Sequence, residues 1–558
     1  MLIRLGPPLA VFLLTGPILL GLAGTLLPAL GFLPALGGMA LTLDHLADVA
    51  TRPGMAASTA MSLAAGLVTA AVSLGAVFLF VGAFAGTRIF ERVQHLISPL
   101  LSVPHAAAAF GLAFLIAPSG MVARLVSPEL TGWMRPPDML IVNDPMGLSM
   151  MAGLIVKEIP FLLLVTLAAL PQLRLAETRA LTASLGYGRL AGFLFALWPG
   201  IYRQIRLAVF AVIAFATSVV DVAAILGPTT PAPLAVRLVQ WMSDPDLGAR
   251  YVASAGAVLQ LGVTAAALAV WIAGERLLGG LVMALCETGR RLRRDRLPAI
   301  AGLAAMLATF AVIAAGLVTL ALWSFAGLWQ FPDALPKSFS FRTWMQAGPR
   351  IAGPLATTLV VAVLSTLIAA ALAILCLMRE DETGRRNNRS LWLIYLPLLV
   401  PQAAFLFGLQ LLFLVAGADA TLAALVFTHL IFVLPYVFLS LRDPWRAFDR
   451  RFDAVAAGLG KGRWAALFHV RLPMLARAVL TAAAVGFAVS IGQYLPTVLI
   501  GAGRLDTITT EAVALASGGN RRVIGVYAFL QMALPAAGFL VATAVPALLF
   551  RSRRALRV

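Results

Sequence analysis

Residues 453–477 read DAVAAGLGKGRWAALFHVRLPMLAR, a stretch that lies between two long apolar segments but is too polar and glycine-rich to cross a membrane. The part from Asp453 to Ala457 predicts a short helix with an acidic residue at the positive end of the helix dipole. Gly460 predicts a turn, and a second apolar helical pattern runs from there to Pro473. The sequence therefore predicts a helix–turn–helix elbow that is basic on one side and apolar on the other.

A second copy of this elbow occurs earlier in the chain. Residues 177–203 read ETRALTASLGYGRLAGFLFALWPGIYR, and an offset of 274 residues aligns Gly186 with Gly460. The same offset aligns Leu185 with Leu459, Gly188 with Gly462, Arg189 with Arg463, and Pro199 with Pro473. Because these pairs include arginine and proline as well as the common small residues, we infer an internal repeat.

The composition excludes an ordinary soluble protein. The 558 residues are 61% hydrophobic and 12% charged, with a mean hydropathy of +0.94. A helix of about 20 apolar residues spans a bilayer. Segments of that kind fall at 7–37, 55–86, 94–117, 147–171, 200–227, 252–282, 298–330, 351–378, 391–416, 420–441, 474–500 and 524–550. The sequence therefore predicts an all-α polytopic membrane protein of about 12 transmembrane helices, and we interpret the first segment as a retained span.

The segments divide into two pseudo-symmetric six-helix halves. Residues 1–286 form the predicted first half, 287–297 a basic link, and 298–558 the second half. The repeat extends beyond the elbows, because VPHAAAAFGL at 103–112 matches VPQAAFLFGL at 400–409. Each half is expected to place its elbow between its fourth and fifth spans.

The net charge of +18 would suggest a nucleic-acid partner in a soluble protein. In a membrane protein, basic residues collect in the loops on the cytoplasmic side. Most of the 42 Lys and Arg residues fall on one side if both termini and both elbows are cytoplasmic. We therefore predict that orientation and no nucleic-acid partner.

The two elbows resemble the cytoplasmic coupling loop of binding-protein-dependent ABC importer permeases. That loop carries an acidic residue, small residues, a Leu-Gly pair and a later Leu-Pro pair. The resemblance implies that these positions couple to an ATPase: Asp453, Leu459, Gly460, Leu472 and Pro473 in the second elbow, and Glu177, Leu185, Gly186 and Pro199 in the first. Arg179, rather than an acidic residue, aligns with Asp453.

A single chain with both halves looks like the fused permeases of the iron(III), thiamine and related putative importers. The resemblance implies two copies of an ATP-binding subunit, a periplasmic or extracellular solute-binding protein, and a location among the lipids of a bacterial inner (plasma) membrane. The chain lacks a Gly-x-x-x-x-Gly-Lys-Ser/Thr phosphate loop, and its five histidines show no metal-ligand spacing. We therefore expect no enzymatic activity, no cofactor and no metal in this chain.

Polar residues inside the apolar segments are candidates for a solute path. Asp221 and Gln493 follow a matching Phe-Ala-x-Ser landmark in each half and precede the Gly/Pro positions 227–228 and 501–503. His105 and Gln402 follow equivalent prolines. The alternative for all four is a role in helix packing. Lys157 and Glu158 either face such a path or lie near a helix entrance.

Two other function classes remain open from the residues alone. A twelve-span secondary transporter driven by an ion gradient also has repeated halves, but it has no reason to keep matched elbows. A membrane-embedded enzyme acting on lipid would need a polar constellation at the interface. The residues do not identify the transported solute.

Overall fold

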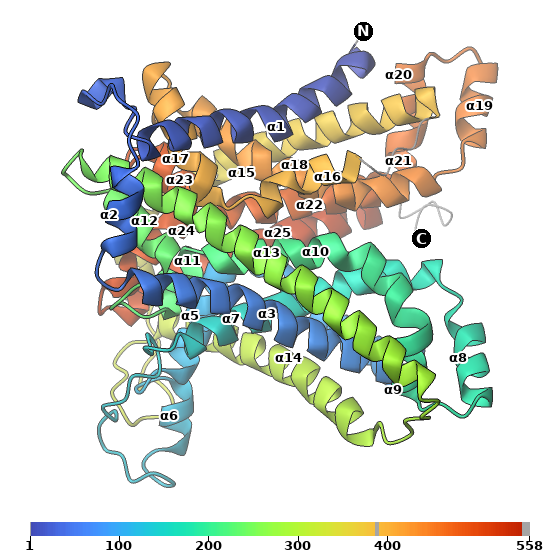
Figure 1. The fold of residues 1–558 in the computed structure, drawn as a ribbon, viewed down its shortest axis with the longest axis horizontal. Coiled ribbons are helices and arrows are strands. Elements are labelled where there is room, and N and C mark those ends of the chain that lie inside the picture. Colours follow the sequence, from blue (N-terminus) through green and yellow to red (C-terminus); the bar gives the residue numbers. More distant parts are fainter. Residues whose placement is uncertain (1, 385–389, 550–558) are drawn as a thin grey trace.

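The computed structural model describes residues 2–384 and 390–549, which are helical apart from loops and two isolated bridges. Ten helices are long and apolar enough to cross a membrane, or up to 12 if each of two bent helix pairs is one span. The spans run side by side along the long axis of the molecule (Figure 1). This architecture confirms the prediction of an all-α polytopic fold.

The first half contains thirteen α-helices, with the following bounds: α1 (Leu2–Ala29), α2 (Asp44–Thr51), α3 (Met55–Phe84), α4 (Arg88–Ile97), α5 (His105–Ile116), α6 (Met121–Val126), α7 (Leu148–Ala169), α8 (Leu175–Ser184), α9 (Arg189–Gly192), α10 (Trp198–Ser218), α11 (Asp221–Leu226), α12 (Leu234–Met242) and α13 (Ala249–Glu287). Short 3-10 turns η1 (Pro34–Leu36), η2 (Ser98–Ser102) and η3 (Leu170–Gln172) and the π-helical turn η4 (Phe193–Leu197) lie among them.

The second half contains twelve described α-helices: α14 (Arg296–Phe325), α15 (Arg342–Thr383), α16 (Ser390–Leu399), α17 (Gln402–Val415), α18 (Leu422–Ala447), α19 (Arg451–Gly458), α20 (Arg463–Ala466), α21 (Leu472–Met474), α22 (Ala476–Ile491), α23 (Leu495–Gly501), α24 (Ile508–Ala514) and α25 (Arg521–Leu549). The π-helical turn η5 (Leu467–Arg471) and the 3-10 turn η6 (Leu515–Ser517) complete it.

The first span of each half packs against the other half. α1 lies along α17 and α15, whereas α14 lies along α5 and α3. The crossings are close because glycines meet: a Cβ on Gly24 of α1 would lie 2.9 Å from the Cα of Gly408, and one on Gly316 of α14 would lie 2.9 Å from the carbonyl carbon of Gly111. Gly111 and Gly408 occupy equivalent positions in the matching segments 103–112 and 400–409. α1 and α14 are therefore exchanged between the halves, and each crosses the opposite half at the glycine of the repeated segment.

The third span of each half differs from the sequence expectation. The apolar segment 94–117 is not one helix, since α4 ends at Ile97 and α5 starts at His105 after the N-cap Pro104. In the second half the corresponding pair, Trp392–Leu399 and Gln402–Val415, is bent by 89°. Pro104 and Pro401 thus stand at the starts of α5 and α17 and not inside a continuous helix. Proline cannot donate the backbone hydrogen bond that a helix interior requires.

Each fifth span breaks earlier than expected. The sequence placed the breaks at 227–228 and 501–503, where α11 and α23 end. The structure adds a break upstream in each half, between Ser218 and Asp221 and between Ile491 and Leu495. Asp221 therefore begins a short helix after the break, while Gln493 lies within the break itself.

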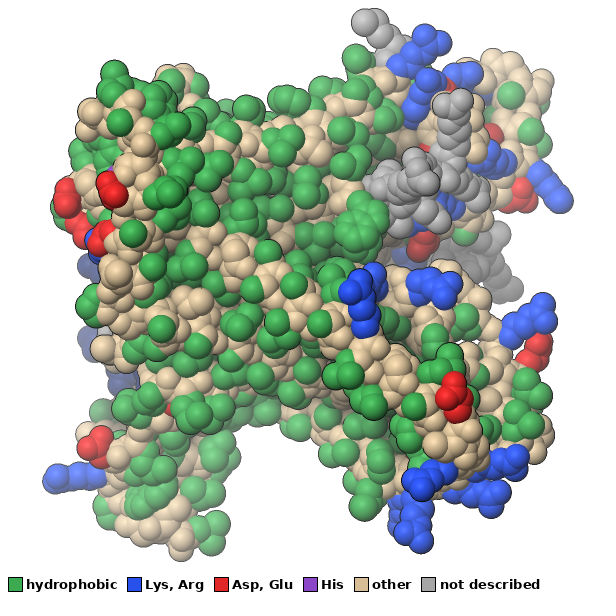
Figure 2. All heavy atoms as spheres, viewed as in Figure 1, with side chains coloured by type: hydrophobic (Ala, Val, Ile, Leu, Met, Phe, Trp, Pro, Cys, Tyr) green, Lys and Arg blue, Asp and Glu red, His purple; other side chains and the backbone are tan. Residues whose placement is uncertain are grey.

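The surface separates an apolar belt from a charged end. Green apolar side chains cover the middle of the molecule in Figure 2, and basic side chains gather at the end where Figure 1 places α8, α9, α19 and α20. Exposed leucines, valines and phenylalanines along α1, α13 and α15 belong to the belt. This distribution fits a multi-pass membrane protein whose elbows lie outside the bilayer.

Candidate coupling elbows and transmembrane pathway

The two elbows have the same turn. Gly186 has φ +81° and Gly460 has φ +74°, which is the left-handed region that favours glycine. In the second elbow the Gly460 N–H donates to Ala457 O at 2.9 Å and the next N–H donates to Ala456 O at 3.0 Å. The first elbow has the equivalent bonds to the carbonyls of Ala183 and Thr182, at 2.9 Å and 3.1 Å. This is the Schellman arrangement, which satisfies the last carbonyls of a helix.

The equivalence continues beyond the turn. Gly188 and Gly462 are N-caps with ψ 163° in both halves, and each starts a four-residue helix. A five-residue π-helical turn follows in each elbow, η4 and η5. These wide turns directly precede Pro199 and Pro473, which lack the N–H that an α-helical bond would use. The predicted elbow and its repeat are therefore present as one conformation used twice.

The exit from the elbow differs between the halves. Arg189–Ser218 is continuous over 30 residues, so Pro199 does not end the first helix. In the second half, Arg463–Met474 and Ala476–Ile491 meet at 81°. Pro199 therefore lies inside a helix that continues from the elbow, whereas the chain bends just after Pro473, although a π-helical turn precedes both prolines.

The outer face of each elbow presents apolar side chains. Leu459 is 74% exposed and Leu185 is 47% exposed. One turn earlier, Val455 and its equivalent Leu181 are also exposed, each at 61%. The second elbow adds Trp464 and Phe468, whose rings stack at 6.3 Å. These exposed apolar groups form a cluster outside the membrane belt, and such clusters are typical of surfaces that another protein covers.

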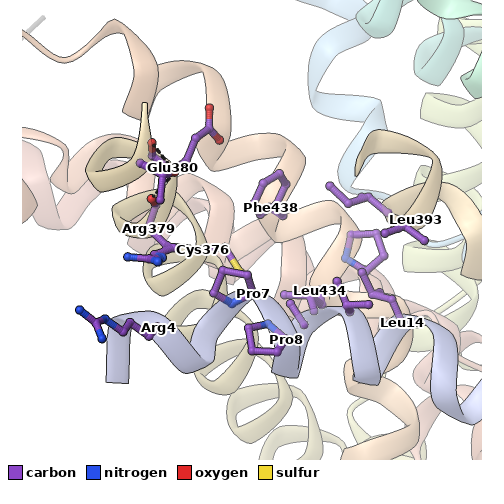
Figure 3. Close-up of a pocket in the computed structure, with 15 residues that line it drawn as sticks. Arg4, Pro7, Pro8, Leu14, Cys376, Arg379, Glu380, Leu393, Leu434 and Phe438 are labelled. Atoms are coloured by element: carbon purple, nitrogen blue, oxygen red, sulfur yellow. Dashed lines mark hydrogen bonds between the residues drawn. The ribbon is translucent and has the colours of Figure 1, made fainter. Parts of the chain in front are cut away.

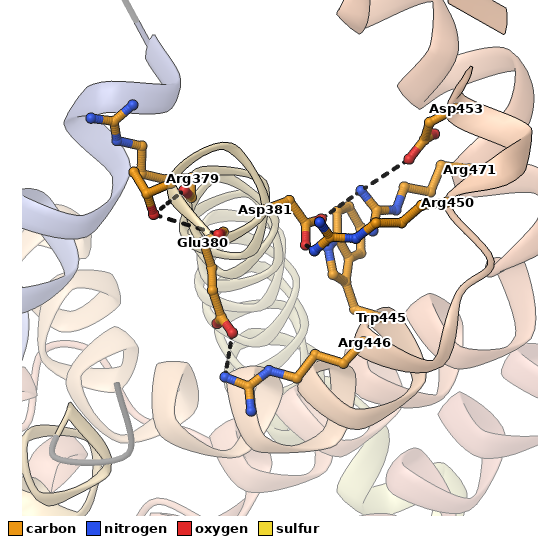
Figure 4. Close-up of polar contacts among 9 residues, drawn as sticks. Arg379, Glu380, Asp381, Trp445, Arg446, Arg450, Asp453 and Arg471 are labelled. Carbon is orange, nitrogen blue, oxygen red and sulfur yellow. Dashed lines mark hydrogen bonds and ion pairs between the residues drawn. The ribbon is translucent and has the colours of Figure 1, made fainter. Parts of the chain in front are cut away.

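The second elbow is anchored by acidic residues at the end of α15 (Figure 4). Asp381 lies 2.7 Å from Arg471 and also pairs with Arg450, and it accepts a 2.9 Å bond from the Trp445 indole. The flanking Glu380 and Glu382 pair with arginines too, namely Arg446 at 2.5 Å and Arg463. Asp453, the acidic residue of the motif, lies 3.7 Å from Arg471. It therefore acts inside the elbow, on the same arginine that holds the elbow to α15.

The first elbow is anchored without acidic residues on the neighbouring span. Arg179, the equivalent of Asp453, donates to the carbonyl oxygens of Ala85 and Gly82 at the end of α3, and Arg189 donates to Ala85 O at 2.9 Å. Those carbonyls carry the negative end of the helix dipole. Burial and the neighbouring Arg189 cation lower the pKa of Arg179 to about 10, so it stays charged near neutral pH. Glu177 pairs with Arg174 at 3.3 Å on the exposed surface and makes no other ion pair within the described part of the chain.

The basic link covers part of the first elbow. Leu292 O accepts from the Gly188 N–H at 2.9 Å, and Asp295 Oδ2 accepts from the Leu190 N–H at 2.9 Å. Arg293 Nε donates to Gly186 O at 3.0 Å. The link therefore caps the start of α9, and no comparable segment caps α20 among residues 2–384 and 390–549.

Each break in the fifth spans is braced by a glutamine from a sixth span. Gln260 of α13 donates to Thr217 O at 3.0 Å. Gln531 of α25 donates to Thr509 Oγ1 at 3.0 Å, and Thr509 donates to Ile491 O at 2.5 Å. Both glutamine side chains are fully buried. Gln260 directly, and Gln531 through Thr509, thus satisfy carbonyl groups that the interrupted helices leave without a helical partner.

Polar residues from both halves lie within electrostatic range of one another next to these breaks. His105 Nε2 lies 3.1 Å from Glu158 Oε1, and buried Asp221 interacts electrostatically with His105. The second half contributes Tyr436, which interacts with Glu158, and Tyr494, which interacts with Asp221. The sequence-based candidates omitted both tyrosines, although Tyr494 directly follows the candidate Gln493.

His105 and Asp221 interact electrostatically, and Gln493 lies near His105 along the chain of contacts through Gly492 and Pro104. Gln493 stands in the second break, where the adjoining Gly492 would place a Cβ 3.9 Å from Pro104. Its carbonyl accepts from Thr497 Oγ1 at 3.0 Å. Gln402 begins α17, and within the described ranges no hydrogen bond joins its side chain to His105 or Asp221. Lys157 donates to the carbonyls of Leu100 and Leu101 at 3.1 Å and 3.0 Å.

Comparison with known proteins gives two relevant similarities, and no family model matches the chain. The chain is 31% identical over 504 residues to the inner membrane ABC transporter permease protein YnjC of Escherichia coli K12, covering 89% of each chain. It is 32% identical over 95 residues to the molybdenum transport system permease protein ModB of Azotobacter vinelandii, which covers 17% of this chain and 42% of that one.

Proposed function

Because the chain belongs to the ABC importer permease family and is a multi-pass inner-membrane subunit of that kind, we propose that its two elbows each bind one copy of a separate ATP-binding subunit. The observation that carries the proposal is the repeated glycine turn, with Gly186 and Gly460 in the same conformation and Leu185 and Leu459 exposed beside them. ATP hydrolysis then takes place in the partner subunits. The two halves meet at the 287–297 link.

The elbows are suited to transmit motion because they are continuous with the fifth spans. The first elbow leads into α10 as one helix, and the second leads into α22 through a bend of 81°. Both spans then reach the breaks, which lie next to the polar residues His105, Glu158 and Asp221. A displacement of the elbows by ATP-driven closure would therefore be carried to the two breaks, which are the positions where the chain can change direction most easily.

We infer that the elbow side faces the cytoplasm and that a periplasmic or extracellular solute-binding protein delivers the solute on the other side. The gathering of basic residues at the elbow end supports this orientation (Figure 2). Both termini then lie in the cytoplasm. The solute path is proposed to pass His105 and Asp221, with Gln493 and Gln402 nearby in the second half.

The function is tested by purification and reconstitution. The chain purified alone is expected to hydrolyse no ATP, whereas the chain purified from its own membrane should carry two copies of an ATP-binding protein. Uptake into vesicles should require ATP and that partner, and an ion gradient alone should not drive it. Nucleotide hydrolysis by the isolated chain, after contaminants are excluded, would contradict the proposal.

A further inference from the structure

A cavity of about 430 Å³ lies beside the N-terminal part of α1, between α1 and the helices α15, α16 and α18 (Figure 3). Most of its wall is apolar, with Pro7, Leu14, Leu434 and Phe438 among the lining residues. Its charged lining residues are Arg4, Arg379 and Glu380, which Figure 3 shows together at one end. Neither the elbow surface nor the polar pathway uses this cavity.

The cavity lies on the seam between the two halves. α1 comes from the first half but touches α15 at Gly6, where a Cβ would lie 2.7 Å from the Cβ of Leu375. It touches α17 at Gly21, where a Cβ would lie 2.3 Å from Phe405 O. α1 also packs against α13 and α16, and the cavity remains between its N-terminal part and α15, α16 and α18. A molecule in that space contacts elements of both halves at once.

The cavity has a polar end and an apolar end in a defined order. Glu380 adjoins Asp381 and Glu382, whose arginine partners Arg450 and Arg463 belong to the second elbow region, so the charged end lies on the elbow side of the membrane. Leu14 lies ten residues further along α1 than Arg4, which at the helical rise places it roughly 15 Å deeper. A membrane lipid has the same order, with a headgroup at the interface and acyl chains below it.

The charged end has more basic than acidic side chains, because Glu382 is shared between Arg379 and Arg463. Glu380 is neutralised by Arg446 at 2.5 Å, and Arg379 pairs with Glu382 at 2.9 Å. Arg4 is exposed and has no acidic partner within the described ranges. An anionic group at this position would complete the charge balance, and a phosphate can accept hydrogen bonds from a guanidinium in a bidentate manner.

We propose that this cavity binds one anionic phospholipid from the leaflet on the elbow side. Its phosphate lies at Arg4 and Arg379, and one acyl chain runs along Pro7, Leu14 and Phe438. The bound lipid fastens the exchanged helix α1 to the second half, next to the end of α15 that anchors the second elbow. The site is therefore distinct from the solute path and from the elbow surface.

The test uses the purified full-length chain and a phosphatidylglycerol that carries a diazirine on its acyl chain. After photolysis, mass spectrometry should find the label on peptides of α1, α16 and α18. Arg4→Gln is expected to lower this labelling about five-fold, since each basic residue near an anionic lipid contributes a factor of that size. Val11→Trp, which fills the cavity from a half-exposed position, should abolish it. Arg92→Gln, an exposed arginine of α4 that does not line the cavity, is the matched control and should change nothing.

A competition measurement keeps the test independent of how the variants fold. In the unaltered chain, unlabelled phosphatidylglycerol should displace the probe from these peptides, and phosphatidylcholine with the same acyl chains should not. Equal displacement by the two lipids would show ordinary acyl-chain solvation and would overturn the proposal. Labelling that survives Arg4→Gln at full yield in a monodisperse protein would overturn it as well.

Discussion

Arg471 of the second elbow lies 2.7 Å from Asp381 at the end of α15 and stacks over the buried Trp445 ring, with its guanidinium carbon 4.0 Å from the ring centroid. Asp381 therefore joins an elbow, a span and an aromatic side chain. The equivalent position in the first half has no such acidic residue, and Arg179 and Arg189 bind the carbonyls at the end of α3 instead. The same elbow is thus held in two chemically different ways.

Asp381→Ala should loosen the second elbow. The substitution removes the partner of two arginines and of the Trp445 indole, and leaving such groups unsatisfied costs about 1–3 kcal/mol. We expect a lower melting temperature, weaker copurification of the ATP-binding subunit and several-fold slower transport. Asp419→Ala, which removes an exposed pair with Arg504 at 3.5 Å, is the control and should cost less than about 0.5 kcal/mol. Equal effects of the two variants would contradict this role of Asp381.

Gly460→Leu should abolish transport while the chain remains inserted in the membrane. A Cβ on Gly460 would meet no atom within 4 Å, so the expected cost is the positive φ alone, about 1–3 kcal/mol. That strain would turn α20 away from its partner subunit. Gly458→Ala, at an open helical position two residues earlier, is the control and should transport normally. Normal transport by Gly460→Leu at equal membrane abundance would show that the elbow is not the coupling element.

Gly186→Leu should have a milder effect than Gly460→Leu. Its φ is also positive, but the first elbow is held by Arg179 on α3 and by the link at Gly188 and Leu190, which do not depend on the glycine. The group that a Cβ would meet is the end of the flexible Arg293 side chain, at 2.9 Å. Transport and copurification measured beside Gly460→Leu give the comparison. A larger loss for Gly186→Leu would reverse the proposed ranking of the two elbows.

Cysteine labelling should place both elbows in the cytoplasm. Gly462→Cys is suitable because a Cβ there meets no atom within 4 Å, whereas one on Gly188 would lie 2.3 Å from Leu292 O. Ser184→Cys, at the exposed end of α8, reports on the first elbow instead. With the exposed Cys286 replaced by serine, an impermeant maleimide should label both sites in inside-out vesicles only. Labelling in intact cells would refute this orientation.

Asp221→Asn should change solute selectivity or the rate of transport and leave the ATP-binding subunit bound. Asp221 interacts electrostatically with His105 and Tyr494 next to the first break, at the opposite end of α10 from the first elbow. Copurification and transport in the same preparation separate the two effects. Loss of the ATP-binding subunit together with transport would place Asp221 in the structural framework and not in the path.

The elbow and its repeat could be predicted from the sequence because a turn with positive φ leaves a glycine signature at a fixed spacing. An alignment of the two halves places Gly186 opposite Gly460, and both glycines have a positive φ. The number of spans was also accessible, since hydropathy depends only on local composition. The anchoring acid Asp381 could not be found in this way, because its partner Arg471 is distant in sequence and its neighbours resemble an ordinary charged end of a span.

The packing of α1 and α14 against the opposite halves could not be predicted from the sequence either, because an apolar helix shows the same hydropathy whichever helices surround it. The repeated pair Gly111 and Gly408 is visible in the sequence, but the pattern does not identify Gly316 of α14 and Gly24 of α1 as their partners. The earlier breaks in the fifth spans left no glycine or proline signal in the first half, where Val219 and Val220 stand at the break. Packing against the glutamine braces, rather than a local breaker residue, accompanies that change of direction.

The bond from the Gly408 N–H to Thr25 Oγ1, at 3.0 Å, joins residues 383 positions apart. α1 leaves the ribosome well before α17, because more than 370 residues separate the two helices in the chain. Until then Gly21, Gly24 and Thr25 face lipid or a chaperone, because the helix that closes over them does not exist. Assembly of this protein therefore cannot proceed by completing one half and then the other. In a chain that stops before α17, the helix α1 lacks the surface against which it packs.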